Sequence, residues 1–172
     1  GLSTRRTYEK GQFSIPSDTA CYPAKIMHGH MEELIDKGIE TIFYPSLSYN
    51  IDEKQSDNHY NCPIVAYYAE LLRSNLHRLD SVRFLYPYLN INSEKELTKE
   101  LYQYLHPFWP DLTHGEVKRA VTAGFSAFDA YRTQIRQWGH EALEYARAHG
   151  RRIMILAGRP YHIDPEISHG ID

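Results

Sequence analysis

The chain has 172 residues, a formal net charge of −3, 42% hydrophobic residues and 24% charged residues, which is the composition of a globular protein. This length suffices for one ordinary domain, or for one and a half small ones. No lysine- and arginine-rich run favours nucleic acid, and no apolar stretch approaches the ~18 residues of a membrane helix. Two cysteines, Cys21 and Cys62, are too few for a disulfide framework, so we expect reduced thiols in a cytoplasmic protein.

The first third of the chain predicts a helix and then a strand. Residues 1–18 are polar and irregular, and we expect them to have no core of their own. Apolar residues at helical spacing predict a helix over 20–37, which Gly38 ends. The stretch 39–45 reads "IETIFYP" and predicts a short buried strand. A second helix is expected over 63–76.

The remainder predicts two more strands and two more helices. The stretch 82–89, "VRFLYPYL", predicts a strand. Ser93 and Glu96 form a capping box that opens a helix to about Leu105, and a long helix with an apolar stripe is expected over 115–149. Residues 151–158, "RRIMILAG", predict the strongest strand, because a continuous apolar run is typical of a parallel strand buried on both faces.

These elements predict an α/β fold, with a short, mainly parallel sheet flanked by helices and a long helix that leads into a second α/β unit. We expect a cysteine-carrying domain over 1–110, a helical segment over 111–150, and the first strand and loop of the second unit over 151–172. A crossover helix normally follows a parallel strand, yet the chain stops at "SHGID". We therefore expect a piece of a longer protein, cut inside that unit.

Both cysteines occupy the same kind of frame, after a polar loop and before an amphipathic helix. Helix N-termini offer free N–H groups and the positive end of the helix dipole, which stabilise a thiolate. Thiolates bind iron–sulfur clusters and zinc. Successive helix N-termini gather at the carboxyl edge of a parallel sheet, so we expect Cys21 and Cys62 to face one cleft. The alternative is that each cysteine is a small buried hydrophobic residue.

Two cysteines cannot complete a site with four ligands. Other ligands would come from His28, His30 or His59, from another part of the protein, or from a substrate. A closed zinc site has little support, because no C-x-x-C or H-x-x-x-H pair is present and the two histidines of "HGH" point to nearly opposite sides of a helix.

Three stretches together resemble one known family: "SDTACYPAKIMHGHMEELIDKGIETIFYP", "SDNHYNCPIVAYYAELL" and "AGRPYHIDPEISHGID". The family comprises the activators, or activase-related proteins, of 2-hydroxyacyl-CoA dehydratases, which contain a domain related to the iron–sulfur subunits of those dehydratases. The likeness covers the chain from about Tyr8 to Asp172.

The resemblance implies a [4Fe-4S] cluster. Full-length proteins of this family join the domain to an ATPase of the acetate-kinase and actin type, which drives low-potential electrons into a dehydratase. The related dehydratase subunits hold their cluster through three cysteines, and Cys21 and Cys62 match two of those positions. The pattern places a third cysteine near "FYPSLSY", where this sequence has Ser46, so we expect the third ligand beyond Asp172.

Two loops supply further candidate binding residues, and the resemblance implies the partners. His59, with Asn58, could hydrogen-bond to a cluster sulfur or an acyl-CoA oxygen, or could simply form a turn. Arg159 and His162 lie in the loop after the 151–158 strand, where α/β proteins place binding residues. Partners would be a 2-hydroxyacyl-CoA dehydratase or an acyl-CoA, with a homodimer as a further option, and neither nucleic acid nor a membrane.

The isolated chain is expected to be inactive, because it has no ATPase motif and ATP would bind a domain outside it. Two alternative functions stay open at this point. One is a structural or docking domain that has lost its cluster, and the other is a zinc-stabilised domain.

Overall fold

The structure is a computed structural model that describes residues 3–54 and 56–168. It divides into two compact units, Gly1–His114 and Gly115–Asp172. The first unit contains α1 (Arg5–Gly11), η1 (Gln12–Ser14), α2 (Tyr22–Asp36), β1 (Thr41–Phe43), β2 (Ser46–Tyr49), α3 (Pro63–Asn75), η2 (His77–Ser81), β3 (Arg83–Leu85), β4 (Tyr88–Asn90) and α4 (Glu94–Leu105). The helix α5 (His114–Ala148) begins at the last residue of the first unit. It is followed by η3 (Pro160–Ile163) and α6 (Pro165–Ser168).

The strands form a parallel, two-stranded ribbon, which confirms the α/β prediction. β1 pairs with β3 and β2 pairs with β4, both in parallel register. Between these pairs the N–H of Ser46 donates to the carbonyl of Pro87 at 2.8 Å, so each pair continues the other. Pro45 and Pro87 divide the ribbon at matching places, because proline has no N–H for the ladder.

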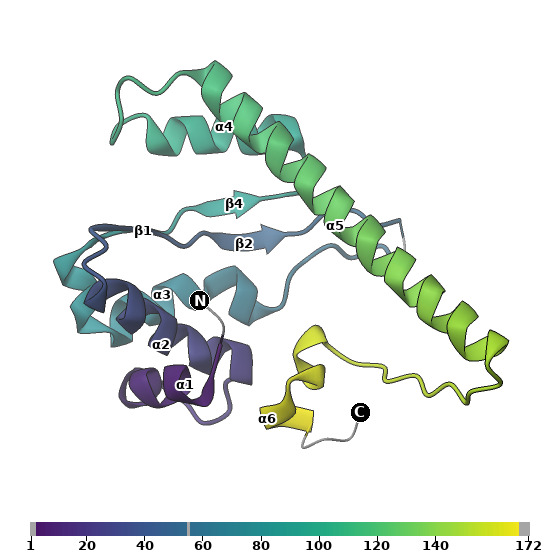
Figure 1. Ribbon diagram of the computed structural model, residues 1–172. Helices are drawn as coiled ribbons and strands as arrows, with labels where there is room; N and C mark the ends of the chain where they lie inside the picture. The colour runs from purple at the N-terminus through teal and green to yellow at the C-terminus, as the bar shows by residue number, and fades with distance from the viewer. Residues whose placement is uncertain (1–2, 55, 169–172) are drawn as a thin grey trace. The chain divides into compact units, whose positions relative to one another are not determined.

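Helices cover both faces of the ribbon (Figure 1): α2 and α3 lie on one side and α4 on the other. The main core lies under α2 and α3 and consists of Ala24, Met31, Ile42, Tyr68, Leu72, Leu76 and Leu79. The predicted helices begin within two residues of the observed starts, and Ser93 caps α4 by accepting a hydrogen bond from the N–H of Glu96 at 3.3 Å.

The N-terminal segment is more ordered than the sequence predicts. It forms α1, and Thr7 and Gly11 are buried there. A β-carbon on Gly11 would fall 2.1 Å from the nitrogen of Gly29, and one on Gly29 would fall 1.7 Å from the carbonyl oxygen of Thr7. The two helices α1 and α2 therefore meet backbone to backbone, and only glycine permits this approach.

The prediction of a strand over residues 151–158 is wrong. This stretch has neither helix nor strand structure, and Ile155 is 83% exposed. An apolar run supplies strand propensity, but a strand forms only when its N–H and C=O groups find a paired neighbour. No strand in the described part of the chain pairs with it.

Candidate functional site

Cys21 and Cys62 both occupy the N-cap position of a helix, as the sequence predicts. Cys21 precedes α2 with φ −65° and ψ 155°, and Cys62 precedes α3 with φ −63° and ψ 156°. A proline follows in the first turn of each helix, and neither side chain makes a capping hydrogen bond. Both thiols are free and partly buried. Each is therefore available for a ligand at a helix N-terminus.

The chain path brings these two helix starts to one end of the ribbon. α2 leads through Gly38 into β1, and α3 leads through η2 into β3, the parallel neighbour of β1. Because α2 and α3 contact each other and run back along the strands, both begin on the side where β2 ends (Figure 1). Ligands of α/β proteins bind at this carboxyl edge. That both thiols hold one ligand stays a prediction.

Tyr68 belongs to the core cluster against which Cys21 packs. Its side chain is only 1% exposed, and burial raises the pKa of its phenol to about 12, with further contributions from the charges of Tyr44 and Cys21. Tyr44 and Cys21 both pack against the core cluster. The thiol of Cys21 thus borders a region of low polarity, in which electrostatic interactions are strengthened.

Ser46 is a buried hydroxyl without a partner. Its side chain is 0% exposed, and its Oγ has no hydrogen-bond partner among the described residues. Ile42 and Tyr44 pack into the core under α2 and α3, and strand residues two apart share a face, so Ser46 faces the same helices nearer the carboxyl edge. A buried polar group of this kind calls for an explanation, and a bound ligand is one. The sequence alone marks Ser46 only as the residue that stands where the family pattern places a third cysteine.

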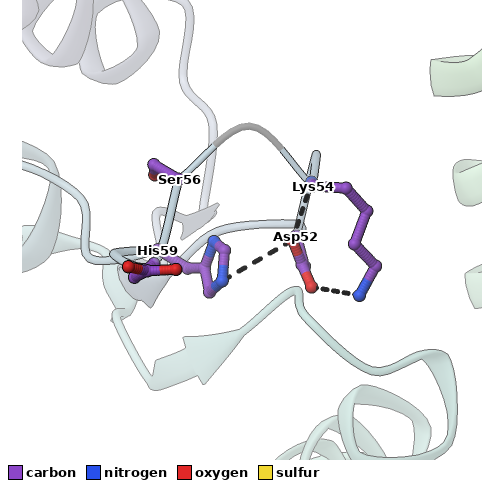
Figure 2. Close-up of a pocket in the computed structure, with 5 residues that line it drawn as sticks. Asp52, Lys54, Ser56 and His59 are labelled. Carbon is purple, nitrogen blue, oxygen red and sulfur yellow. Dashed lines mark hydrogen bonds and ion pairs between the residues drawn. The ribbon is translucent and has the colours of Figure 1, made fainter.

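A polar loop leads from β2 to Cys62. It folds back on β2 through hydrogen bonds from the N–H of Asn50 to the carbonyl of His59 at 2.8 Å and from the N–H of Asn61 to that of Ser48 at 2.9 Å. An open pocket of about 670 Å³ lies in the loop (Figure 2) and is lined by Asp52, Lys54, Ser56, Asp57 and His59.

His59 points across this pocket toward Asp52, and its Nε2 lies 3.5 Å from Asp52 Oδ1 (Figure 2). Hydrogen bonds from the side chain and backbone of Lys54 lower the pKa of the Asp52 carboxyl, and the charge of His59 contributes further. Asp52 therefore stays ionised and orients His59. The side chain of Asn58 accepts a hydrogen bond from the N–H of Tyr60 at 3.0 Å, as a turn-forming residue would. The sequence pattern gave no sign of the Asp52 partner.

The two histidines of "HGH" have structural roles. His28 is 0% exposed, with Nδ1 2.8 Å from Ser14 Oγ and Nε2 3.0 Å from the Tyr68 hydroxyl. Because Ser14 donates its own proton to the carbonyl of Gly11 at 3.0 Å, its Oγ accepts from His28 Nδ1–H, and His28 Nε2 accepts from Tyr68. Burial lowers the pKa of His28 to about 4. His28 is thus neutral, with both ring nitrogens in use, and cannot serve as a ligand in this arrangement.

His30 is also engaged, with its Nε2 2.9 Å from Ser3 Oγ and its Nδ1 3.5 Å from a carboxylate oxygen of Glu33. Across residues 3–54 and 56–168, no group of three or more histidine, cysteine, aspartate or glutamate side chains is placed to hold a metal ion. Ligands beyond the two thiols would therefore come from outside the described part of this chain.

Arg159 and His162 lie in the second unit. His162 Nδ1 accepts a hydrogen bond from the N–H of Arg159 at 3.0 Å, and its ring makes an edge contact with Tyr161, with centroids 4.5 Å apart. A β-carbon on Gly158 would fall 2.4 Å from the same Nδ1. His162 therefore stabilises a tight turn, and the prediction that this pair binds a cofactor stays a prediction.

Fold and site together define an α/β domain with two N-cap thiols at the carboxyl edge of a parallel ribbon. The chain belongs to the family described as the CoA enzyme activase uncharacterised domain (DUF2229), whose model matches residues 1–172. No curated protein and no solved structure matches the chain. None of the helices within the described residues has the length and apolar character to cross a membrane.

Proposed function

We propose that this chain supplies the thiolates of Cys21 and Cys62 to a [4Fe-4S] cluster in a longer, activase-related protein. The observation that carries the proposal is the pair of cysteine N-caps, which share one backbone conformation and leave both thiols unused. Membership of the CoA enzyme activase domain family supports the same function. The site would serve ATP-driven electron transfer, with ATP bound in another domain.

The donor set fits two of the cluster's ligands. Iron–sulfur clusters are held by cysteine thiolates, and Cys21 and Cys62 would hold this one through their Sγ atoms. The unpartnered hydroxyl of Ser46, which faces the same helical layer, fits a polar group bound there. When bound, the cluster would supply one-electron chemistry at low potential. The remaining ligands would come from other parts of the protein.

The other residues would shape the surroundings of the bound group. Tyr44 and Tyr68 would limit the access of water to the Cys21 side. In its imidazolium form, in which both ring nitrogens carry a proton, His59 would face Asp52 with Nε2 and donate a hydrogen bond from Nδ1 to a cluster sulfur or an acyl-CoA oxygen. Arg159 and His162 would contact the cofactor or substrate in the full-length protein, whose partner would be a 2-hydroxyacyl-CoA dehydratase.

Anaerobic iron and sulfide analysis of the full-length protein tests this proposal. We expect bound iron and sulfide with broad absorbance near ~400 nm, and a loss of most of both in Cys21→Ser and in Cys62→Ser. Ser93→Ala is the matched control, because it alters the N-cap of α4 and should leave the iron content unchanged. Zinc in place of iron would favour a zinc-stabilised domain. Absence of any metal from the anaerobic protein would favour a docking domain.

A further inference from the structure

One face of α5 follows a heptad pattern, with Phe125 and Leu143 as the large apolar residues outside it. Along this 35-residue helix, apolar or small residues recur alternately four and three positions apart. The positions are Val117, Val121, Gly124, Phe128, Tyr131, Ile135, Trp138, Ala142 and Tyr145. A period of about 3.5, rather than 3.6, is the pattern of a helix that packs against a second helix in a left-handed supercoil.

The second half of this face is uncovered. Val117 and Val121 are buried, but Phe128 is 41% exposed, Tyr131 61% and Trp138 57%. Ile135 and Tyr145 are exposed as well. Contiguous apolar surface of this kind marks an interaction site on a soluble protein. The heptad spacing specifies an amphipathic helix as the occupant.

We propose that residues 128–145 of α5 pair antiparallel with the same segment of a second copy of this chain. In a two-fold pair, facing positions are exchanged between the copies. When Ile135 faces Trp138 of the second copy, Trp138 faces Ile135, Phe128 faces Tyr145, and Ala142 faces Tyr131. Each exposed residue of the face therefore has a partner from the same face of the second copy. The smallest residue, Ala142, lies opposite the large Tyr131.

A parallel pair would use the same residues less well. It would place Trp138 against Trp138, which crowds the interface, and Ala142 against Ala142, which leaves a gap. In the antiparallel pair the flanking positions place Gln134 beside Glu141 and Arg132 beside Gly139, and no like charges face each other.

The available area suits a dimer. A fully buried aromatic side chain contributes roughly 150–250 Å², so four half-exposed ones offer roughly 400 Å² per copy. Ile135 and Ala142 add to this, so that the two copies together bury about 1,000 Å², the lower end of the range for a specific interface.

Sedimentation equilibrium of the full-length protein tests the dimer. We expect Trp138→Glu to raise the dimer dissociation constant at least ~100-fold, because a buried aromatic anchor is replaced by a charge in both copies. Thr133→Glu adds the same charge on the opposite, exposed face and should change the constant by less than ~3-fold. A protein that stays monomeric at all concentrations, or equal effects of the two variants, would overturn the proposal.

Disulfide cross-linking tests the register without loading charge onto the helix. Tyr131→Cys and Ala142→Cys, mixed in equal amounts and oxidised, should give a cross-linked heterodimer, whereas each variant alone should not. Wild-type protein, which retains Cys21 and Cys62, sets the background. Cross-linking of Tyr131→Cys with itself would show a parallel pair and overturn the proposed register.

Discussion

The helices α2 and α3 begin in the same way but are held in place differently. Both start with a cysteine N-cap and a proline. α2 is fixed by the backbone contact of Gly29 with α1 and by the buried polar chain from Ser14 through His28 to Tyr68. α3 relies mainly on apolar burial along its inner face, through Ala66, Ala69 and Leu72, and Tyr68 joins it to the polar chain. The close backbone contact with α1 is therefore specific to α2, whereas the polar chain through His28 and Tyr68 ties the two helices together.

Gly29→Ala should give the largest effect. The added methyl group would meet the backbone of α1, which cannot rotate away, so we expect a loss of about 3 kcal/mol or more in the free energy of unfolding. Chemical denaturation measures this. Gly139→Ala is the control, since its methyl group meets open space on α5 and should stabilise by up to about 1 kcal/mol. Similar stabilities of both variants would show that α1 and α2 do not meet as described.

The pH dependence should be of nearly the same size. Burial lowers the pKa of His28 from 6.5 to about 4, so between these values the unfolded chain binds the proton and the folded chain does not. The contribution of neutral His28 to the free energy of unfolding is fully present above about pH 6.5. It falls by about 3 kcal/mol as the pH drops to about 4. Denaturation of wild type and His28→Gln across this range isolates the effect. An unchanged slope in the variant would assign the loss to other groups.

Tyr68→Phe should cost about 1–3 kcal/mol, because it leaves His28 Nε2 buried without its hydrogen-bond donor. The adjacent Tyr67 is 54% exposed, so Tyr67→Phe should stay within about 0.5 kcal/mol of wild type. Equal costs at the two positions would contradict the polar link between α2 and α3.

Ser46→Ala should give the smallest effect, and of opposite sign. Its hydroxyl is buried without a partner, so removal should stabilise the ligand-free chain by about 1 kcal/mol. Ser14→Ala removes a paired hydroxyl and should instead destabilise the chain by about 1–2 kcal/mol. Destabilisation by Ser46→Ala would reveal a partner and weaken the case for a ligand at this position.

The local features were predictable from sequence. The N-cap positions of Cys21 and Cys62 follow from a polar loop, a proline in the first turn and an apolar period, all of which lie within a few residues. The 151–158 run failed as a strand because pairing depends on a distant partner. The docking of α1 was missed because two glycines far apart in sequence carry no apolar signal.

The side-chain partners in the site could not be predicted either. The pairing of His59 with Asp52 depends on how the loop folds back on β2. The lack of a hydrogen-bond partner for the Ser46 hydroxyl depends on which groups surround it in the fold, and no local sequence pattern predicts those neighbours.

Pro45 also determines how the ribbon meets other chains. The N–H groups of Tyr44 and Ser46 point inward to the neighbouring strand, so the backbone nitrogen of Pro45 faces the outer edge. That edge lacks a donor at Pro45, and along β2 it already pairs with the loop through Asn50 and Asn61, so an incoming strand cannot form an unbroken ladder along it. Proline on an edge strand is a known protection against edge-to-edge aggregation. A newly made chain would thus keep this side of its sheet from capturing strands of its neighbours.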